Sequence, residues 1–161
     1  MKLLVFSDSH SCPNRILKAV ELHHKNCDLI LFLGDGLRDL NVIEMKYPNI
    51  PIIKVKGNCD YFTQGDALSE NILDVDGIRI LITHGHNHGV KYGYEAILRY
   101  ASEMEVDAVL FGHTHVPYES VEYINDKKIY LFNPGSVATT STYGVLNTSN
   151  GVLVTNVAKI C

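Results

Sequence analysis

The feature that most constrains this chain is a series of short apolar runs, each of which ends in a small cluster of polar residues. The first three runs cover residues 2–6, 28–33 and 50–55, with a helical pattern after Pro13 and another over 37–45 between them. Continuous apolar runs are typical of strands that are buried on both faces. Because strands and helices alternate, this half predicts a parallel sheet built from crossover units.

The second half of the chain has the pattern of antiparallel hairpins. Asp76-Gly77, Asn125-Asp126 and Asn150-Gly151 each separate two apolar runs, and such dipeptides are typical of tight turns. The expected strands are 72–75, 78–83, 108–111, 118–124, 128–132, 145–146 and 152–157, with a helix over 94–105. We therefore predict a single α/β domain over residues 1–161, with two packed mixed β-sheets flanked by helices in an α/β/β/α sandwich.

Composition narrows the class of protein. The 161 residues are 46% hydrophobic and 20% charged, as expected of a chain with one buried core. The net charge of −4 supplies no basic field for nucleic acid, no apolar run is long enough to span a membrane, and residues 1–6 do not resemble a signal peptide. The four cysteines form no CxxC pair, which favours a reducing compartment. We expect a cytoplasmic protein without a membrane or nucleic-acid partner, and a homo-oligomer is left open.

Polar residues gather at the ends of five predicted strands. In chain order they are Asp8-Ser9-His10, Gly34-Asp35, Gly57-Asn58-Cys59-Asp60, Thr83-His84-Gly85-His86 and Gly112-His113-Thr114-His115. Ligands of open α/β sheets bind outside the carboxyl ends of the strands. The pattern Gly-His-x-His is expected about 0.03 times by chance in this composition, yet it occurs at 85–88 and again at 112–115. The five clusters therefore predict one ligand site at a common edge.

The side chains of these clusters suit a metal site. Asp8 and His10 are two residues apart, so an extended backbone would direct both to one side, and His113 and His115 have the same spacing. Carboxylates and imidazoles suit Mn²⁺, Fe, Zn²⁺ or Ni²⁺ and fit a soft thiolate site poorly. There is one carboxylate too many for a single ion, and the amide oxygen of Asn58 adds a further donor. The set therefore indicates two ions that share a bridging ligand.

The order of these clusters resembles that of the calcineurin-like metallophosphoesterases. The short length and Asn133-Pro134-Gly135-Ser136 are similar to their small prokaryotic, YfcE-like phosphodiesterase branch. The resemblance covers residues 1 to about 136. It implies two divalent ions, with Mn²⁺ favoured and Ni²⁺, Fe or Zn²⁺ as alternatives. The implied ligands are Asp8, His10 and His115 for one ion, Asn58, His84 and His113 for the other, and Asp35 as the bridge.

The resemblance also implies a reaction: a hydroxide shared by the two ions attacks the phosphorus of a small phosphodiester, in line with the leaving oxygen. Asp35, Asn58, Cys59 and His84 would be the catalytic residues. Cys59 stands where many members carry a histidine that helps to protonate the leaving group, and a thiol lacks the dual acid and base character of imidazole. We therefore expect good leaving groups, such as nitrophenolates, to be turned over far better than alkyl groups.

Several of these residues also have simpler interpretations. Asp8 and Asp35 could cap the helices that follow them, since aspartate is a favoured N-cap residue. Asn58 and Asp60 follow a glycine, as ordinary turn residues do. Asp39 and Asp60 are expected to cap or to support the site, and not to bind metal.

Other ionisable residues are given weaker roles or none. His86 is either a substrate contact in the metal cleft or a solvated loop residue, and His88 is expected to be solvated. His23 and His24 lie late in the first helix, where a cation suits the helix dipole, and have no site role. The basic residues Lys56, Lys91 and Arg99 are expected at the surface.

Two other classes of function compete with the phosphodiesterase. One is a catalytically weak or inactive scaffold that kept the fold, as in the retromer scaffold subunit, which is similar to this family. Degenerate scaffolds are expected to lose ligands, whereas all seven positions here carry side chains that can bind metal. The other is a nuclease, for which neither a basic stripe nor a row of stacking aromatics is evident.

Overall fold

Ten strands, three α-helices and two short 3-10 turns make up the computed structural model, which describes residues 1–61, 67–124 and 126–161. The strands are β1 (Lys2–Phe6), β2 (Leu29–Phe32), β3 (Ile52–Lys54), β4 (Glu70–Val75), β5 (Ile78–Thr83), β6 (Ala108–Leu110), β7 (Tyr118–Ile124), β8 (Lys127–Asn133), β9 (Thr142–Ser149) and β10 (Val152–Lys159). The α-helices are α1 (Pro13–His23), α2 (Asn41–Lys46) and α3 (Glu95–Glu103), and the 3-10 turns are Leu37–Leu40 and His86–His88.

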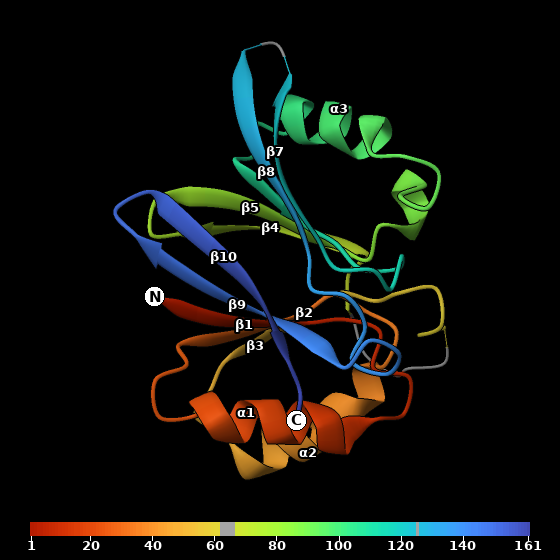
Figure 1. Cartoon of the computed structure of the whole chain (residues 1–161), viewed down its shortest axis with the longest axis vertical. Coiled ribbons are helices and arrows are strands. Elements are labelled where there is room, and N and C mark those ends of the chain that lie inside the picture. The colour runs from red at the N-terminus through yellow and green to blue at the C-terminus, as the bar shows by residue number, and fades with distance from the viewer. Residues whose placement is uncertain (62–66, 125) are drawn as a thin grey trace.

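Two five-stranded sheets lie face to face, with helices on the outside (Figure 1). The first sheet has the order β10-β9-β1-β2-β3, in which β1, β2 and β3 are parallel. The second has the order β4-β5-β6-β8-β7 and is also mixed. Helices α1 and α2 cover the outer face of the first sheet, and α3 covers the outer face of the second. The predicted α/β/β/α sandwich of two mixed sheets is confirmed.

Strand β1 shows why a continuous apolar run is needed here. Leu3 and Val5 point into the core between the two sheets, whereas Leu4 and Phe6 pack against α1 and α2 on the opposite face. All four side chains are fully buried. Burying an aliphatic or aromatic side chain contributes about 1.5–3 kcal/mol, so the run from Leu3 to Phe6 anchors both layers at once.

The turn signals of the second half are confirmed where the structure describes them. Asp76-Gly77 joins β4 to β5, and Asn150-Gly151 joins β9 to β10, with both residues of each pair at positive φ, as type I′ turns require. Strands β7 and β8 pair as the third hairpin, but Asn125 of its expected turn lies outside the described residues. Strand β9 is longer than expected because it pairs with both β1 and β10.

The segment over 37–45, expected to be helical, is a 3-10 turn followed by the short helix α2. Leu37 and Leu40 are both buried, and residues three apart lie on the same side of a 3-10 turn. This turn therefore fixes the chain just after β2 against the core, close to the end of the sheet.

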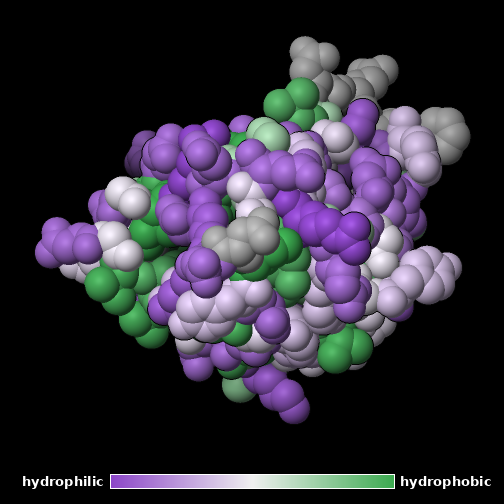
Figure 2. Space-filling model, turned by 90° about the horizontal axis from the view of Figure 1, so that it is seen from above, coloured by the Kyte–Doolittle hydropathy of each residue, from purple (hydrophilic) through white to green (hydrophobic). Residues whose placement is uncertain are grey.

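The surface and the strand ends complete the outline. Hydrophilic side chains predominate on the face seen from above, and its hydrophobic residues lie in several separate areas (Figure 2). None of the helices in the described part of the chain is long and apolar enough to cross a membrane.

In Figure 1 the loops after β1, β2, β3 and β6 gather on the right of the molecule. Parallel strands thus deliver the predicted site residues to one edge.

Candidate metal centre

The loops that carry the candidate ligands have an unusual backbone. Asp8, His10, Asp35, His113 and His115 have φ values of 54°, 40°, 60°, 67° and 62°. Residues other than glycine adopt this left-handed region rarely, and such residues cluster at functional sites. The expectation that an extended backbone aligns each Asp-x-His or His-x-His pair is therefore wrong. Sharp turns at the strand ends place these side chains instead.

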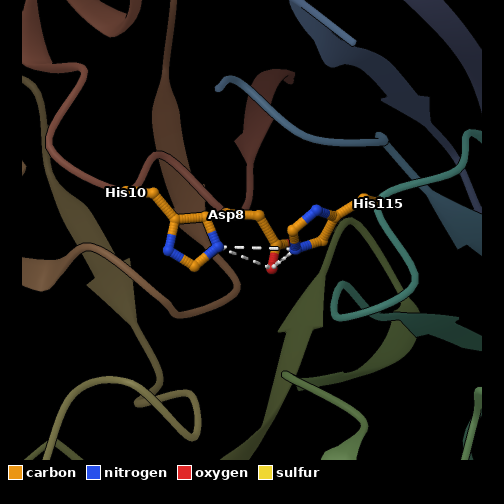
Figure 3. Close-up of side chains that lie close together, drawn as sticks. All are labelled: Asp8, His10 and His115. Carbon is orange, nitrogen blue, oxygen red and sulfur yellow. Dashed lines mark hydrogen bonds and ion pairs between the residues drawn. The ribbon is translucent and has the colours of Figure 1, made fainter. Parts of the chain in front are cut away.

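Asp8, His10 and His115 form the first group of candidate ligands (Figure 3). The two imidazole rings point toward the Asp8 carboxylate from loops that follow β1 and β6. Asp8 Oδ1 lies 3.1 Å from His115 Nε2 and 3.8 Å from His10 Nε2, and the two Nε2 atoms are 3.4 Å apart. These are the three residues that the family resemblance implies for one ion.

The surroundings of the Asp8 carboxylate show whether a cation fits between these three residues. The Asp8 side chain is fully buried, and its Oδ2 accepts hydrogen bonds from Ser7 Oγ (2.6 Å) and the His113 amide (3.1 Å). Its Oδ1 is buried and has no hydrogen-bond partner among the described residues. A buried carboxylate oxygen without a partner is costly, whereas coordination to a metal ion satisfies it. The residues present therefore fit a divalent ion.

A second group lies deeper and centres on His84, whose side chain is fully buried. His84 Nε2 is 3.3 Å from Asp35 Oδ2, 3.2 Å from Asn58 Oδ1 and 3.9 Å from Asp8 Oδ1. His84 Nδ1 lies 2.7 Å from the carbonyl oxygen of Leu33. Since a carbonyl can only accept, Nδ1 carries the proton and donates it there. Nε2 is thereby left free to bind a metal.

Asp35 and His113 complete this arrangement. Asp35 Oδ2 faces both groups, at 3.3 Å from His84 Nε2 and 3.9 Å from His10 Nε2, which is the place that a bridging ligand requires. The His113 ring lies edge-on to that of His84, with centroids 5.0 Å apart. Burial, together with the charge of His84, lowers the pKa of His113 to about 4. His113 is therefore neutral at pH 7, the form in which histidine binds metals.

The capping interpretation of Asp8 and Asp35 is wrong. The residue that precedes α1 is Cys12, and Gly36 precedes the following 3-10 turn; neither end has a side-chain cap. Both carboxylates instead lie beside histidines of the site, Asp8 Oδ1 at 3.1 Å from His115 Nε2 and Asp35 Oδ2 at 3.3 Å from His84 Nε2.

Asp60 supports the loops that carry the ligands, as expected. Its carboxylate accepts hydrogen bonds of 2.7–3.1 Å from four backbone amides, those of Asp35, Gly36, Leu37 and Gly57. Asp39 supports the loop after β1 in the same way, because its Oδ2 accepts hydrogen bonds from Ser9 Oγ and from the Ser11 amide. One buried carboxylate thus ties the Asp35 loop to the loop that holds Asn58.

Asn133 is a supporting residue that the sequence did not reveal. It is fully buried, and its Nδ2 donates to the Gly112 carbonyl (2.9 Å) and to Thr114 Oγ1 (3.0 Å), on either side of His113. Its Oδ1 accepts from the Gly135 amide. The segment 133–136 contributed to the family resemblance, but only the folded chain places Asn133 behind the His113 loop.

Replacing Asn133 with aspartate is expected to weaken metal binding by about 10–100-fold, as is typical when a group that orients ligands is lost. The carboxylate cannot donate, so the Gly112 carbonyl and Thr114 Oγ1 lose their donor. Titration of the metal-free variant with Mn²⁺ measures the effect. Asn156→Asp, an exposed position on β10, is the control with the same charge change. Equal Mn²⁺ affinity in both variants would contradict this role.

The structure also shows where Cys59, His86 and His88 lie. The Cys59 amide donates to Asp35 Oδ1, and partial desolvation together with the Asp35 carboxylate raises the pKa of the Cys59 thiol to about 11. His86 lies beside His84, with ring centroids 5.4 Å apart, which favours the cleft interpretation over a solvated one. The expectation that His88 is solvated is wrong. The 3-10 turn after β5 directs it onto β4, where its Nε2 lies 2.9 Å from Glu70 Oε2.

The protonation of His84 makes the metal-free protein sensitive to pH. Burial alone would lower the pKa of His84, but its hydrogen bond to Asp35 and the charges of Asp8 and Asp35 outweigh burial and raise it above the ordinary 6.5. A histidine whose pKa is raised on folding stabilises the protein fully below the unfolded pKa. That contribution is lost as the pH rises through the folded pKa.

We therefore expect the free energy of unfolding of metal-free protein to fall as the pH rises above 6.5, and to fall less in His84→Gln. Affinity for Mn²⁺ should rise over the same range, because the ion needs neutral His84. Urea denaturation at several pH values measures the first effect. An identical slope in the variant would show that His84 is not the responsible group.

The comparisons with known proteins identify the family. A family model described as a calcineurin-like phosphoesterase superfamily domain matches residues 1–151. The chain is 33% identical over 156 residues to the probable metallophosphoesterase YsnB of Bacillus subtilis, a match that covers 93% of this chain and 86% of that protein. The chain belongs to the calcineurin-like phosphoesterase superfamily. It is thus related to phosphoester hydrolases that depend on divalent metals.

One further relative and two solved structures match most of the chain. The chain is 29% identical to the phosphodiesterase MJ0936 of Methanocaldococcus jannaschii, over 92% of this chain and 93% of that protein. The crystal structure of a protein from Streptococcus pneumoniae that is described as a predicted phosphoesterase has a TM-score of 0.80 at 24% identity. The match covers 98% of this chain and 88% of that chain. Vps29 of Entamoeba histolytica in complex with Zn²⁺ has a TM-score of 0.72 at 19% identity, with both chains fully covered. These two structural matches establish the fold.

Proposed function

We propose that this metallophosphoesterase is a phosphodiesterase that uses two divalent metal ions, with Mn²⁺ favoured. The observation that carries the proposal is the position of Asp35 Oδ2, which faces His10 of one ligand group and His84 of the other. The relative named phosphodiesterase MJ0936, which matches nearly the whole chain, supports diesters as the substrate class.

The candidate ligands form two sets, one for each ion. Asp8, His10 and His115 would hold one ion, and Asn58, His84 and His113 would hold the other, with Asp35 between them. When bound, the ions supply an activated water at neutral pH and positive charge for the phosphoryl oxygens.

The protein fixes the orientation of one candidate ligand, His84, and the protonation state of another, His113. The hydrogen bond from His84 Nδ1 to the Leu33 carbonyl fixes the ring so that Nε2 faces the site. The low pKa of His113 keeps that ligand neutral. Two divalent ions against the carboxylates of Asp8 and Asp35 leave the site positive, although the whole chain carries a net charge of −4. An anionic phosphodiester is therefore attracted to the cleft itself.

Hydrolysis of bis-p-nitrophenyl phosphate, compared with p-nitrophenyl phosphate, tests the proposal. Metal-stripped protein is assayed alone and with added Mn²⁺, Ni²⁺ or Zn²⁺. We expect a metal-dependent rate that is higher on the diester than on the monoester. Failure to hydrolyse either ester with every metal would favour the scaffold alternative, and a higher rate on the monoester would contradict the assignment to diesters.

Cys59→His is expected to change the choice of leaving group. The thiol of Cys59 keeps its proton at neutral pH, since its pKa is about 11, and so is a poor general acid. A positioned general acid contributes about 10²–10⁴-fold for poor leaving groups. Turnover of a dinucleotide should therefore rise by at least about 10-fold relative to bis-p-nitrophenyl phosphate. Cys59→Ser is the control without an imidazole, and an unchanged ratio in Cys59→His would refute this account.

A further inference from the structure

A thiol lies among the candidate metal ligands. Cys59 Sγ, a ring nitrogen of His10 and a carboxylate oxygen of Asp35 all lie within 4.8 Å of one another. Zn²⁺ binds sulfur at about 2.3 Å and imidazole nitrogen at about 2.0–2.1 Å, so two such ligands on opposite sides of one ion are about 4.4 Å apart. A rotation of the exposed Cys59 side chain is enough to close the remaining difference.

We propose that Cys59 is a ligand for Zn²⁺, which it holds together with His10 and Asp35, and that zinc bound in this way inhibits the enzyme. The assignment of the ligand does not depend on the proposed phosphodiesterase function, whereas the inhibition rests on it. Cys59 would bind as the thiolate, and the proton of the thiol would pass to the solvent, as happens when a thiol coordinates a metal ion.

Hydrogen bonds hold the thiol beside the other two ligands. The Cys59 amide donates to Asp35 Oδ1 at 2.7 Å, which ties the backbone of one proposed ligand to the carboxylate of another. Asn58 Nδ2 donates to Cys59 Sγ at 3.3 Å, and Asn58 Oδ1 lies 3.2 Å from His84 Nε2. The Asn58 amide thus turns its oxygen toward the second group of ligands and its nitrogen toward the sulfur. A donor in that position stabilises a thiolate, because hydrogen bonds to an ionised acceptor are stronger than those to a neutral one.

The charge around the thiol favours a cation. Cys59, His10 and Asp35 line one cavity of about 270 Å³, and the described residues of its wall include three carboxylates and a single arginine. A cleft lined mainly by negative charge raises the local concentration of cations. The charges of the Cys59 thiolate and the Asp35 carboxylate would balance those of one divalent ion, with His10 as a neutral third ligand.

The sulfur ligand distinguishes Zn²⁺ from Mn²⁺. Thiolates favour Zn²⁺, whereas Mn²⁺ prefers oxygen ligands, so Cys59 adds to the affinity for Zn²⁺ but not to that for Mn²⁺. The other cysteines lie elsewhere. Cys12 and Cys27 pack against the core beneath α1 and α2, and the exposed Cys161 ends the chain. None of these three belongs to a candidate metal group among the described residues.

Zinc held by Cys59 would compete with the proposed two-ion centre. His10 is a candidate ligand of the first ion, and Asp35 is the candidate bridge between the two ions. An ion that also takes Cys59 would draw both residues toward the Cys59 loop. Zn²⁺ should therefore lower the rate of hydrolysis that Mn²⁺ supports.

Titration of metal-free protein with Co²⁺ tests the assignment of the ligand. Co²⁺ serves as the probe for the zinc site, because a thiolate bound to Co²⁺ gives a charge-transfer band in the near ultraviolet that nitrogen and oxygen ligands do not give. We expect the band in the wild type and in Cys161→Ser, which removes an exposed thiol far from the site. It should be absent in Cys59→Ser, and added Zn²⁺ should abolish it in the wild type.

Affinity for Zn²⁺ and inhibition by Zn²⁺ measure the consequence. Cys59→Ser should weaken Zn²⁺ binding by at least about 10-fold, because the loss of a group that only orients a metal ligand already costs that much. Its affinity for Mn²⁺ should stay close to that of the wild type. With Mn²⁺-loaded protein and bis-p-nitrophenyl phosphate, half-inhibition of Cys59→Ser should need at least about 10-fold more Zn²⁺ than half-inhibition of the wild type, each relative to its own rate without zinc. Cys161→Ser should match the wild type in both measurements.

Three results would overturn the inference. A wild type without the charge-transfer band, or a band that survives Cys59→Ser, would refute the assignment of Cys59 as a ligand. Equal sensitivity of the wild type and Cys59→Ser to Zn²⁺ would refute the inhibition. If the Mn²⁺-loaded wild type hydrolysed neither p-nitrophenyl ester, the proposed function and the inhibition would fail together, and the cobalt spectra would still decide whether Cys59 binds metal.

Discussion

Asp35→Asn is expected to lower kcat/KM for bis-p-nitrophenyl phosphate by about 10³-fold or more. Asp35 Oδ2 is the oxygen that faces both groups of ligands, so its loss should release at least one ion. Charge stabilisation by metal ions contributes several kcal/mol, and 1.36 kcal/mol corresponds to a factor of ten in rate. The rate and the metal content of the purified variant are measured together.

Asp74→Asn is the matched control for this substitution, because it makes the same chemical change at an exposed position on β4. It should retain both the metal content and the rate of the wild type. Retention of two ions and full activity by Asp35→Asn would instead show that Asp35 does not bridge.

Asp60→Asn is expected to reduce both stability and metal binding. The carboxylate accepts from four backbone amides through two oxygens, whereas an asparagine has only one oxygen, so two amides lose their acceptor. At about 1–3 kcal/mol for each buried amide left without a partner, the free energy of unfolding should fall by about 2–6 kcal/mol. Affinity for Mn²⁺ should fall by about 10–100-fold, because Asp35 loses its support.

Urea denaturation of metal-free protein separates the two effects of Asp60→Asn. A loss of stability without metal shows that the carboxylate holds the two loops together on its own. If the variant unfolded at the wild-type urea concentration and bound Mn²⁺ as tightly, the four hydrogen bonds would have no role in the site. Asp74→Asn again serves as the control for the change of charge.

The layers of the fold could be predicted from the sequence because each depends on a local pattern. The uninterrupted apolar run at Leu3–Phe6 predicted a strand buried on both faces, and the structure confirms it. Asp76-Gly77 and Asn150-Gly151 predicted their hairpins, since few other residues adopt positive φ at both turn positions. The five polar clusters could also be placed at one edge, because parallel strands end together.

The details of the site could not be predicted, because they depend on contacts between distant segments. Nothing in the sequence around Asp8 or His115 signals a left-handed backbone, which the surrounding loops impose. Asn133 lies 19 residues after Thr114, so only the paired strands bring its amide to the His113 loop.

The most direct test of the central claim is a titration of metal-free protein with Mn²⁺, in which bound metal and hydrolysis of bis-p-nitrophenyl phosphate are followed in the same samples. A spin-coupled manganese signal in electron paramagnetic resonance reports whether the two ions share a ligand. The account predicts saturation at about two ions per chain, with hydrolysis and the coupled signal appearing together as the second ion binds. Full activity at one ion per chain, or two bound ions without any hydrolysis, would contradict it.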